Sequence, residues 1–127
     1  MGVAMDIVST TLVFDAADMA AESSFWAAVL GGTVEADPVE DDWHDVIVGG
    51  KTVLGVQLAP DHVPPQWPDG GHSQQVHLDL HVADIRAADA EVRALGARVL
   101  REAGLSGKAG FVVYADPAGH PFCLCWG

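Results

Sequence analysis

The sequence predicts an α+β fold of two βαβββ modules in tandem, whose curled mixed sheets enclose a shared cleft. Three observations carry this prediction. A strand-like run that ends in Ala-Asp occurs twice, 66 residues apart, at Thr11–Asp18 and His77–Asp84. Each run leads into a helical stretch that ends in Leu-Gly, and three short strand-like segments follow each helical stretch. An internal repeat of this kind indicates the architecture before any residue chemistry is considered.

The first module is expected to span residues 7–58. A strand is expected at 7–14, where apolar residues alternate weakly. Asp18 is predicted to cap a helix with apolar residues at helical spacing, and Gly31-Gly32 to end it. Strands are then expected at 33–36, 45–48 and 53–58, with the turn Gly49-Gly50 between the last two.

The second module is expected to span residues 76–127. It repeats the order with a strand at 76–82, a helix at 84–95 and strands at 98–101, 111–115 and 122–126. Residues 59–75, which include a run rich in Pro and Gly, are predicted to be the linker between the modules. Residues 1–127 are therefore interpreted as one domain.

The formal net charge is −12, and residues 1–58 hold ten acidic side chains against Lys51 alone. Nucleic acid is not an expected partner, because such binding draws on Lys and Arg that neutralise phosphates. A membrane span is not expected either, because no apolar stretch reaches about 20 residues. The first residues lack the basic start and apolar run of a signal peptide, so a cytoplasmic location is expected, with Cys123 and Cys125 as thiols.

Strand alternation predicts which side chains face the cleft. In the first strand Leu12 and Phe14 are expected under the helix, which turns their neighbours toward the cleft. In the second module the leucines and valines take the helix side, and the polar residues between them face inward. The residues expected to line the cleft are Thr11, Val13, Asp15, Gln57, His77, Asp79 and Cys123.

His77 is the strongest candidate for a catalytic residue, with Asp79 beside it. His77 and His81 lie roughly 13 Å apart along one strand, so at most one of them can belong to a given metal ion. His81 is expected at the rim. As a general base, His77 would have its pKa raised by the neighbouring Asp79 carboxylate.

The same residues also have plainer interpretations. A histidine in a polar cavity is often simply hydrogen-bonded, here to Asp79 or to backbone. Cys123 can be a small core residue rather than a nucleophile or a metal ligand. Trp67, a large aromatic residue on the linker, is expected either to close the cavity or to fill a dimer contact.

Several segments together resemble one superfamily. They are the two Ala-Asp helix entries, the helix end Phe25–Gly31, the segment Trp67–Gly70 that leads toward Gln74–Leu80, and the run Asp116–Leu124. With the order βαβββ twice, they resemble the vicinal oxygen chelate superfamily, most closely its bacterial glyoxalase-like domains, relatives of glyoxalase, bleomycin resistance proteins and dioxygenases. The resemblance covers nearly the whole chain.

The resemblance implies a metal site. Metalloenzymes of the superfamily place His or Gln on the first strand of each module and Glu on the last strand, so that a divalent ion chelates two substrate oxygens. These positions fall on Thr11, Gln57, His77 and Cys123. His77 and Gln57 are thus the implied ligands for Zn, Ni, Mn or Fe, or the chain holds no metal, because neither glutamate position carries a carboxylate.

Three functions stay open at this point. The first is a glyoxalase-like lyase or isomerase that acts on a small oxygenated substrate. The second is a binding protein that sequesters an aromatic or cationic compound, with Trp67 stacked on it, as drug-resistance members of the superfamily do. The third is an interaction module with an empty cavity. A homodimer is expected in each case, with a small-molecule ligand in the first two.

Overall fold

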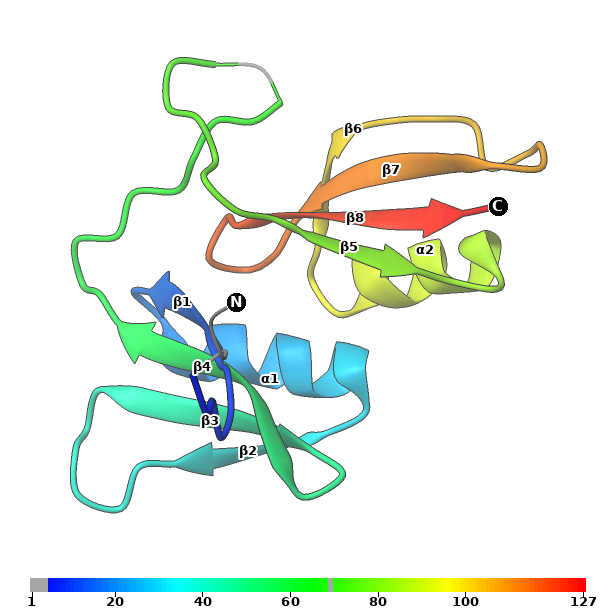
Figure 1. The fold of residues 1–127 in the computed structure, drawn as a ribbon. Coiled ribbons are helices and arrows are strands. Elements are labelled where there is room, and N and C mark those ends of the chain that lie inside the picture. The colour runs from blue at the N-terminus through cyan, green and yellow to red at the C-terminus, as the bar shows by residue number, and fades with distance from the viewer. Residues whose placement is uncertain (1–4, 69) are drawn as a thin grey trace.

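The computed structural model describes residues 5–68 and 70–127. Its elements run strand, helix and three strands, twice over (Figure 1). The predicted α+β class and the tandem βαβββ order are therefore confirmed. The first module contains β1 (Leu12–Ala16), α1 (Met19–Leu30), β2 (Thr33–Ala36), β3 (Trp43–Val48) and β4 (Lys51–Leu58). The second contains β5 (Leu78–His81), α2 (Ile85–Ala94), β6 (Arg98–Arg101), β7 (Gly110–Ala115) and β8 (Pro121–Trp126).

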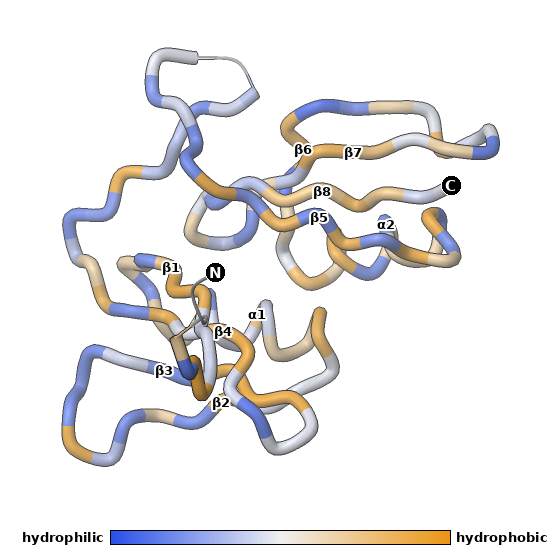
Figure 2. Tube along the Cα trace, in the orientation of Figure 1, coloured by the Kyte–Doolittle hydropathy of each residue, from blue (hydrophilic) through white to orange (hydrophobic). Residues whose placement is uncertain are grey.

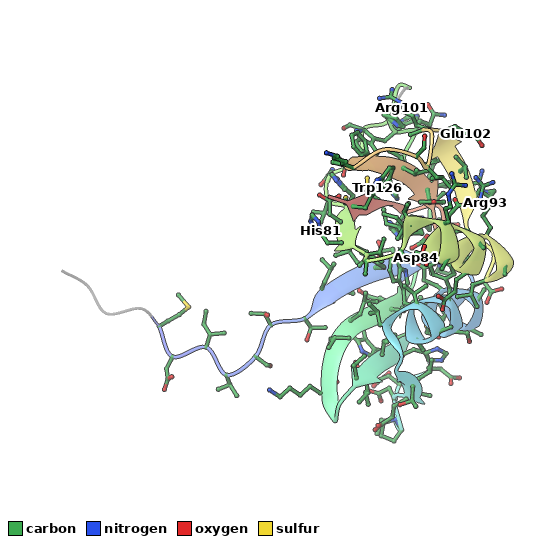
Figure 3. The ribbon with its side chains drawn as sticks, turned by 90° about the vertical axis from the view of Figure 1, so that its right-hand side faces the viewer. His81, Asp84, Arg93, Arg101, Glu102 and Trp126 are labelled. Carbon is green, nitrogen blue, oxygen red and sulfur yellow. The ribbon has the colours of Figure 1, made fainter. Side chains whose placement is uncertain are left out.

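Each module forms one four-stranded mixed sheet. The strand orders are β1-β4-β3-β2 and β5-β8-β7-β6, so β1 and β5 are both edge strands. In each sheet the first strand pairs in parallel with the last, and the other pairs are antiparallel. Figure 3 shows both helices on one side of the molecule. Each sheet therefore has one face covered by a helix and one face without a helix, called the free face below.

The helix caps follow from local sequence. The Asp18 carboxylate accepts a hydrogen bond from the Ala21 amide at 3.0 Å, and that of Asp84 accepts one from the Ala87 amide at 3.1 Å. Both are N-caps that satisfy a free amide of the first turn. Gly31 ends α1 in the left-handed conformation, with φ of 72°. Neither helix in the described ranges is long and apolar enough to span a membrane.

The first strand differs from the prediction. It was expected at 7–14, but β1 covers Leu12–Ala16 and starts where Leu12 pairs with Leu54. Continuing this register toward the N-terminus brings Ser9 opposite Lys51, the first residue of β4. Ile7 and Val8 therefore lie beyond the end of the only strand that could pair with them, and they are 61% and 97% exposed. Alternation of apolar residues did not reveal where the partner strand ends.

The core lies between the sheets and the helices. Apolar side chains on the covered faces of the strands pack against the helices. Figure 2 shows hydrophobic residues concentrated along the strands, whereas the loop between β2 and β3 is mostly hydrophilic. The largest fully buried side chains are Trp26, Tyr114, Phe122, Leu54 and Leu124.

The two modules are joined through the turn between β7 and β8, which contacts α1. Trp26 donates its indole N–H to Asp116 Oδ2 at 2.8 Å, and the Ala118 amide donates to Glu22 Oε1 at 3.0 Å. His120 Nε2 lies 2.7 Å from the carbonyl oxygen of Asp15. The turn therefore carries polar contacts between the modules.

Candidate functional site

The polar residues of β5 and β8 lie on the free face of the second sheet. Phe122 and Leu124 are part of the core, and strand alternation turns Cys123 to the opposite face. By the same alternation Leu78 packs against the core and Asp79 lies on the free face. Asp79 pairs directly with Cys123 across the two strands. The sequence prediction that these two residues share a face is confirmed.

His77, Asp79 and Cys123 form a cluster. One ligand atom from each lies within 4.8 Å of the other two, which makes them a group of metal-ligating side chains in the described part of the chain. His77 Nε2 is 3.2 Å from Asp79 Oδ1. The cluster is open on one side, because the Asp79 side chain is 50% exposed whereas Cys123 is buried.

Cys123 is held as a thiol. Burial raises its pKa to about 12, and the charge of Asp79 and a hydrogen bond to Asp79 act in the same direction. Burial and the Asp79 charge also raise the pKa of Cys125. In the absence of a metal ion, Cys123 is therefore a poor nucleophile at neutral pH, because the thiolate is the reactive form.

Trp67 covers the His77 ring. The two ring centroids are 4.9 Å apart with an angle of 25° between the planes, which is a stacked arrangement. Trp67 was expected either to close the cavity or to fill a dimer contact, and in the structure it lies against His77, the predicted catalytic residue. A stacked indole restricts rotation of the imidazole and keeps water off one of its faces.

The structure does not bring Thr11 and Gln57 into this cluster. In the first module Gln57 pairs with Asp15, which is four residues, or roughly 13 Å, along β1 from Thr11. In the second module Cys123 pairs with Asp79, only two residues from His77. Pairing between the first and last strands is thus offset by two residues between the modules. This difference keeps Gln57 apart from Thr11, whereas Cys123 at the equivalent point of the repeat lies close to His77.

Val13 and Asp15 lie elsewhere as well. They line a cavity of about 570 Å³ at the junction of the modules, together with residues of the connector and His120. Thr11 lines a different hollow, beside Lys51 and Val53. The seven residues expected in one cleft are therefore spread over the cluster, the junction cavity and the free face of the first sheet.

Trp43 is a prominent residue of the first free face that the sequence analysis did not single out. Its ring lies so close to Gly55 that a Cβ there would be 2.5 Å from it. Its indole N–H donates to Asp45 Oδ1 at 2.8 Å. A glycine inside a strand often marks such a close approach, and Gly55 was the available signal.

Comparison with protein families gives one match. Residues 11–125 match the family model described as a glyoxalase-like domain. No curated protein sequence matches the chain.

Several solved structures share the fold. The fosfomycin resistance protein FosX from Listeria monocytogenes has a TM-score of 0.70 at 12% identity, over 97% of this chain and 93% of that one. FosX from Mesorhizobium loti has a TM-score of 0.66 at 13% identity, over 97% and 94%. A glyoxalase/dioxygenase from Nostoc punctiforme has a TM-score of 0.66 at 16% identity, over 96% and 97%. Identities this low establish the fold alone.

Proposed function

The chain belongs to the glyoxalase-like domain family of the vicinal oxygen chelate superfamily, and on that premise we propose that it is a metal-dependent lyase or isomerase of small oxygenated substrates. The observation that carries the proposal is the cluster of His77, Asp79 and Cys123, whose ligand atoms lie within 4.8 Å of one another. Asp79 replaces Gln57 in the ligand set that the sequence suggested.

The donor set fits a divalent ion. Imidazole, carboxylate and thiolate are all zinc ligands, and three protein ligands with an open position are typical of catalytic zinc sites. A thiolate favours zinc over manganese or magnesium. Cys123 would hold the ion as a thiolate, and burial and Asp79 oppose the loss of its proton. Affinity is therefore expected to rise with pH.

The protein residues in and around the cluster would orient the His77 ring and bind the substrate. When bound, the ion supplies Lewis-acid polarisation of substrate oxygens. Trp67 fixes the plane of the His77 ring, and Asp79 contacts its Nε2. The exposed side of Asp79 is where a substrate would approach. Without an ion, the same pair has the arrangement of a general base and the carboxylate that orients it.

Metal binding tests this proposal. We expect wild-type protein to bind one equivalent of Zn²⁺ or Co²⁺ per chain, with the absorption of a cobalt–thiolate bond. His77→Ala and Cys123→Ser should each lower the affinity by about 100-fold or more, because a ligand is lost. His81→Ala is the matched control, because His81 lies on the same strand outside the cluster. Binding without a thiolate band, or equally strong binding in all variants, would reject the site.

A second copy of the chain is the proposed partner. Both free faces expose apolar side chains, with Val13 and Val53 40% exposed and Phe111 52% exposed. The segment before β1 also runs away from the body of the molecule (Figure 3). We propose that a homodimer buries these apolar side chains, and that the protein is cytoplasmic, where the free thiols Cys123 and Cys125 stay reduced.

Phe111→Asp is expected to yield monomers in sedimentation velocity at concentrations where wild type is dimeric. A charge in a buried apolar contact is costly to desolvate. Val39→Asp is the matched control, because Val39 is 84% exposed on the loop between β2 and β3. A Phe111→Asp protein that stays dimeric, or a monomeric wild type, would contradict the proposed interface.

A non-catalytic binder of an aromatic or cationic compound is the second candidate. Trp43 and its bonded Asp45 favour it, since an indole face flanked by carboxylates attracts organic cations. Gln57 and Asp15 are exposed neighbours of Trp43 in the same row of the sheet. A chain that binds no metal but binds an aromatic cation, and loses that binding in Trp43→Ala, would select this candidate.

A further inference from the structure

The junction cavity is a candidate site that is separate from the cluster around His77. β1 from Leu12 to Asp15 lines it, as do connector residues 62–76 in part, and His120 from the turn between β7 and β8. None of His77, Asp79 and Cys123 lines it. Its volume of about 570 Å³ is in the range of small-molecule sites.

An aromatic wall runs along this cavity. The rings of Phe14 and His120 are stacked with centroids 4.8 Å apart, and those of His62 and His120 lie 4.9 Å apart. Val63, Pro65 and Val76 add apolar surface. A ligand with an apolar body would find contact area here.

Several hydrogen-bond acceptors of the cavity have free capacity. His120 Nε2 is 2.7 Å from the Asp15 carbonyl oxygen, and His62 Nε2 is 3.0 Å from that of Ala118. A carbonyl oxygen only accepts, so both Nε2 atoms carry hydrogen and each Nδ1 of a neutral ring is an acceptor. Gln74 Oε1 is buried and meets no donor among the described residues. A buried acceptor without a partner indicates a missing donor.

The charge of the cavity also favours a ligand that donates hydrogen bonds. Asp15 contributes a carboxylate, and no Lys or Arg lines the cavity. We propose that the junction cavity binds a small organic amine, whose ammonium group is held by Asp15 and Gln74 Oε1 and whose apolar body lies against the rings of Phe14, His120 and His62. This site goes beyond the proposed metal chemistry, because it uses none of its residues.

Phenethylamine and its neutral analogue 2-phenylethanol test the proposal. In calorimetric titrations at pH 8, above the ordinary range for histidine protonation, we expect saturable binding of phenethylamine and at least tenfold weaker binding of the alcohol. Asp15→Asn should weaken amine binding by about tenfold, because a charged hydrogen bond is lost. Asp41→Asn, an equal charge change on an exposed loop, should leave it unchanged.

Two further variants complete the experiment. Gln74→Met keeps the length of the side chain, removes the buried acceptor, and should weaken the amine several-fold. His77→Ala should leave amine binding intact while it abolishes metal binding, so the two sites fail independently. The proposal is overturned if wild type does not bind phenethylamine, if amine and alcohol bind alike, or if the affinity follows His77 rather than Asp15 and Gln74.

Discussion

Replacing Glu22 with glutamine is expected to remove much of the loss of stability that we expect for the wild-type chain as pH rises. Glu22 is fully buried, and burial and the neighbouring Asp116 raise the pKa of its carboxyl well above the ordinary value. Oε1 accepts the Ala118 amide, whereas Oε2 meets no donor among the described residues. When Glu22 is protonated, its carboxyl group donates a hydrogen bond to the Asp116 carboxylate.

The direction of the pH effect follows from this proton. Folding raises the pKa of Glu22, so its contribution to stability is complete below the ordinary glutamate pKa and declines as pH rises toward the folded value. Between the two values the free energy of unfolding falls by up to about 1.4 kcal/mol per pH unit. Glutamine resembles the protonated acid in shape and cannot ionise, so the variant should lose this slope.

Urea denaturation at several pH values between about 5 and 9 measures the effect. Glu35→Gln serves as the control, because Glu35 is exposed on β2. At pH 5 Glu22→Ala should be destabilised by about 2–4 kcal/mol, since it leaves a cavity and unpaired polar groups, and like Glu22→Gln it should lose the slope. If wild type and Glu22→Gln show equal slopes, Glu22 is not the group that titrates.

Trp26→Ala is the second large effect, with an expected loss of about 3–5 kcal/mol in the free energy of unfolding. Trp26 is completely buried. Its ring centroid lies 5.2 Å from those of Phe25 and Phe122 and 5.7 Å from that of Phe14. It thus contacts both modules. Alanine would remove an aromatic group from their junction and leave Asp116 Oδ2 without its indole donor.

Trp26→Phe separates packing from hydrogen bonding. It keeps a ring but removes the indole N–H that donates to Asp116, so a loss of about 1–3 kcal/mol is expected. The two variants should be compared with wild type by chemical denaturation under one condition. A loss below about 1 kcal/mol for Trp26→Ala would show that the modules do not depend on this side chain.

The sequence predicted the architecture because a repeat and its helix caps are local signals. Asp18 and Asp84 stand at equivalent points of the repeat, and both cap helices in the structure. Alternation along β5 and β8 likewise predicted that His77, Asp79 and Cys123 share a face. Such predictions need only the pleat of a strand, which does not depend on distant residues.

What the sequence did not predict depends on pairing between distant segments. The two-residue difference in register between the β1–β4 and β5–β8 pairs separates Thr11 from Gln57, and the repeat gave no sign of it. Glu22 stands in the first turn of α1, where helical periodicity alone gives no sign of its burial. Asp116, which also raises its pKa, lies 94 positions along the chain.

That register difference has a consequence for symmetry. Two halves that still paired their strands identically would offer a guest two interchangeable orientations. Here one half provides imidazole, carboxylate and thiol in one place, while the other presents a broad indole surface with acidic neighbours. A compound bound between such unlike halves would meet different side chains at its two ends, so the register difference lets the protein distinguish the ends of an asymmetric ligand.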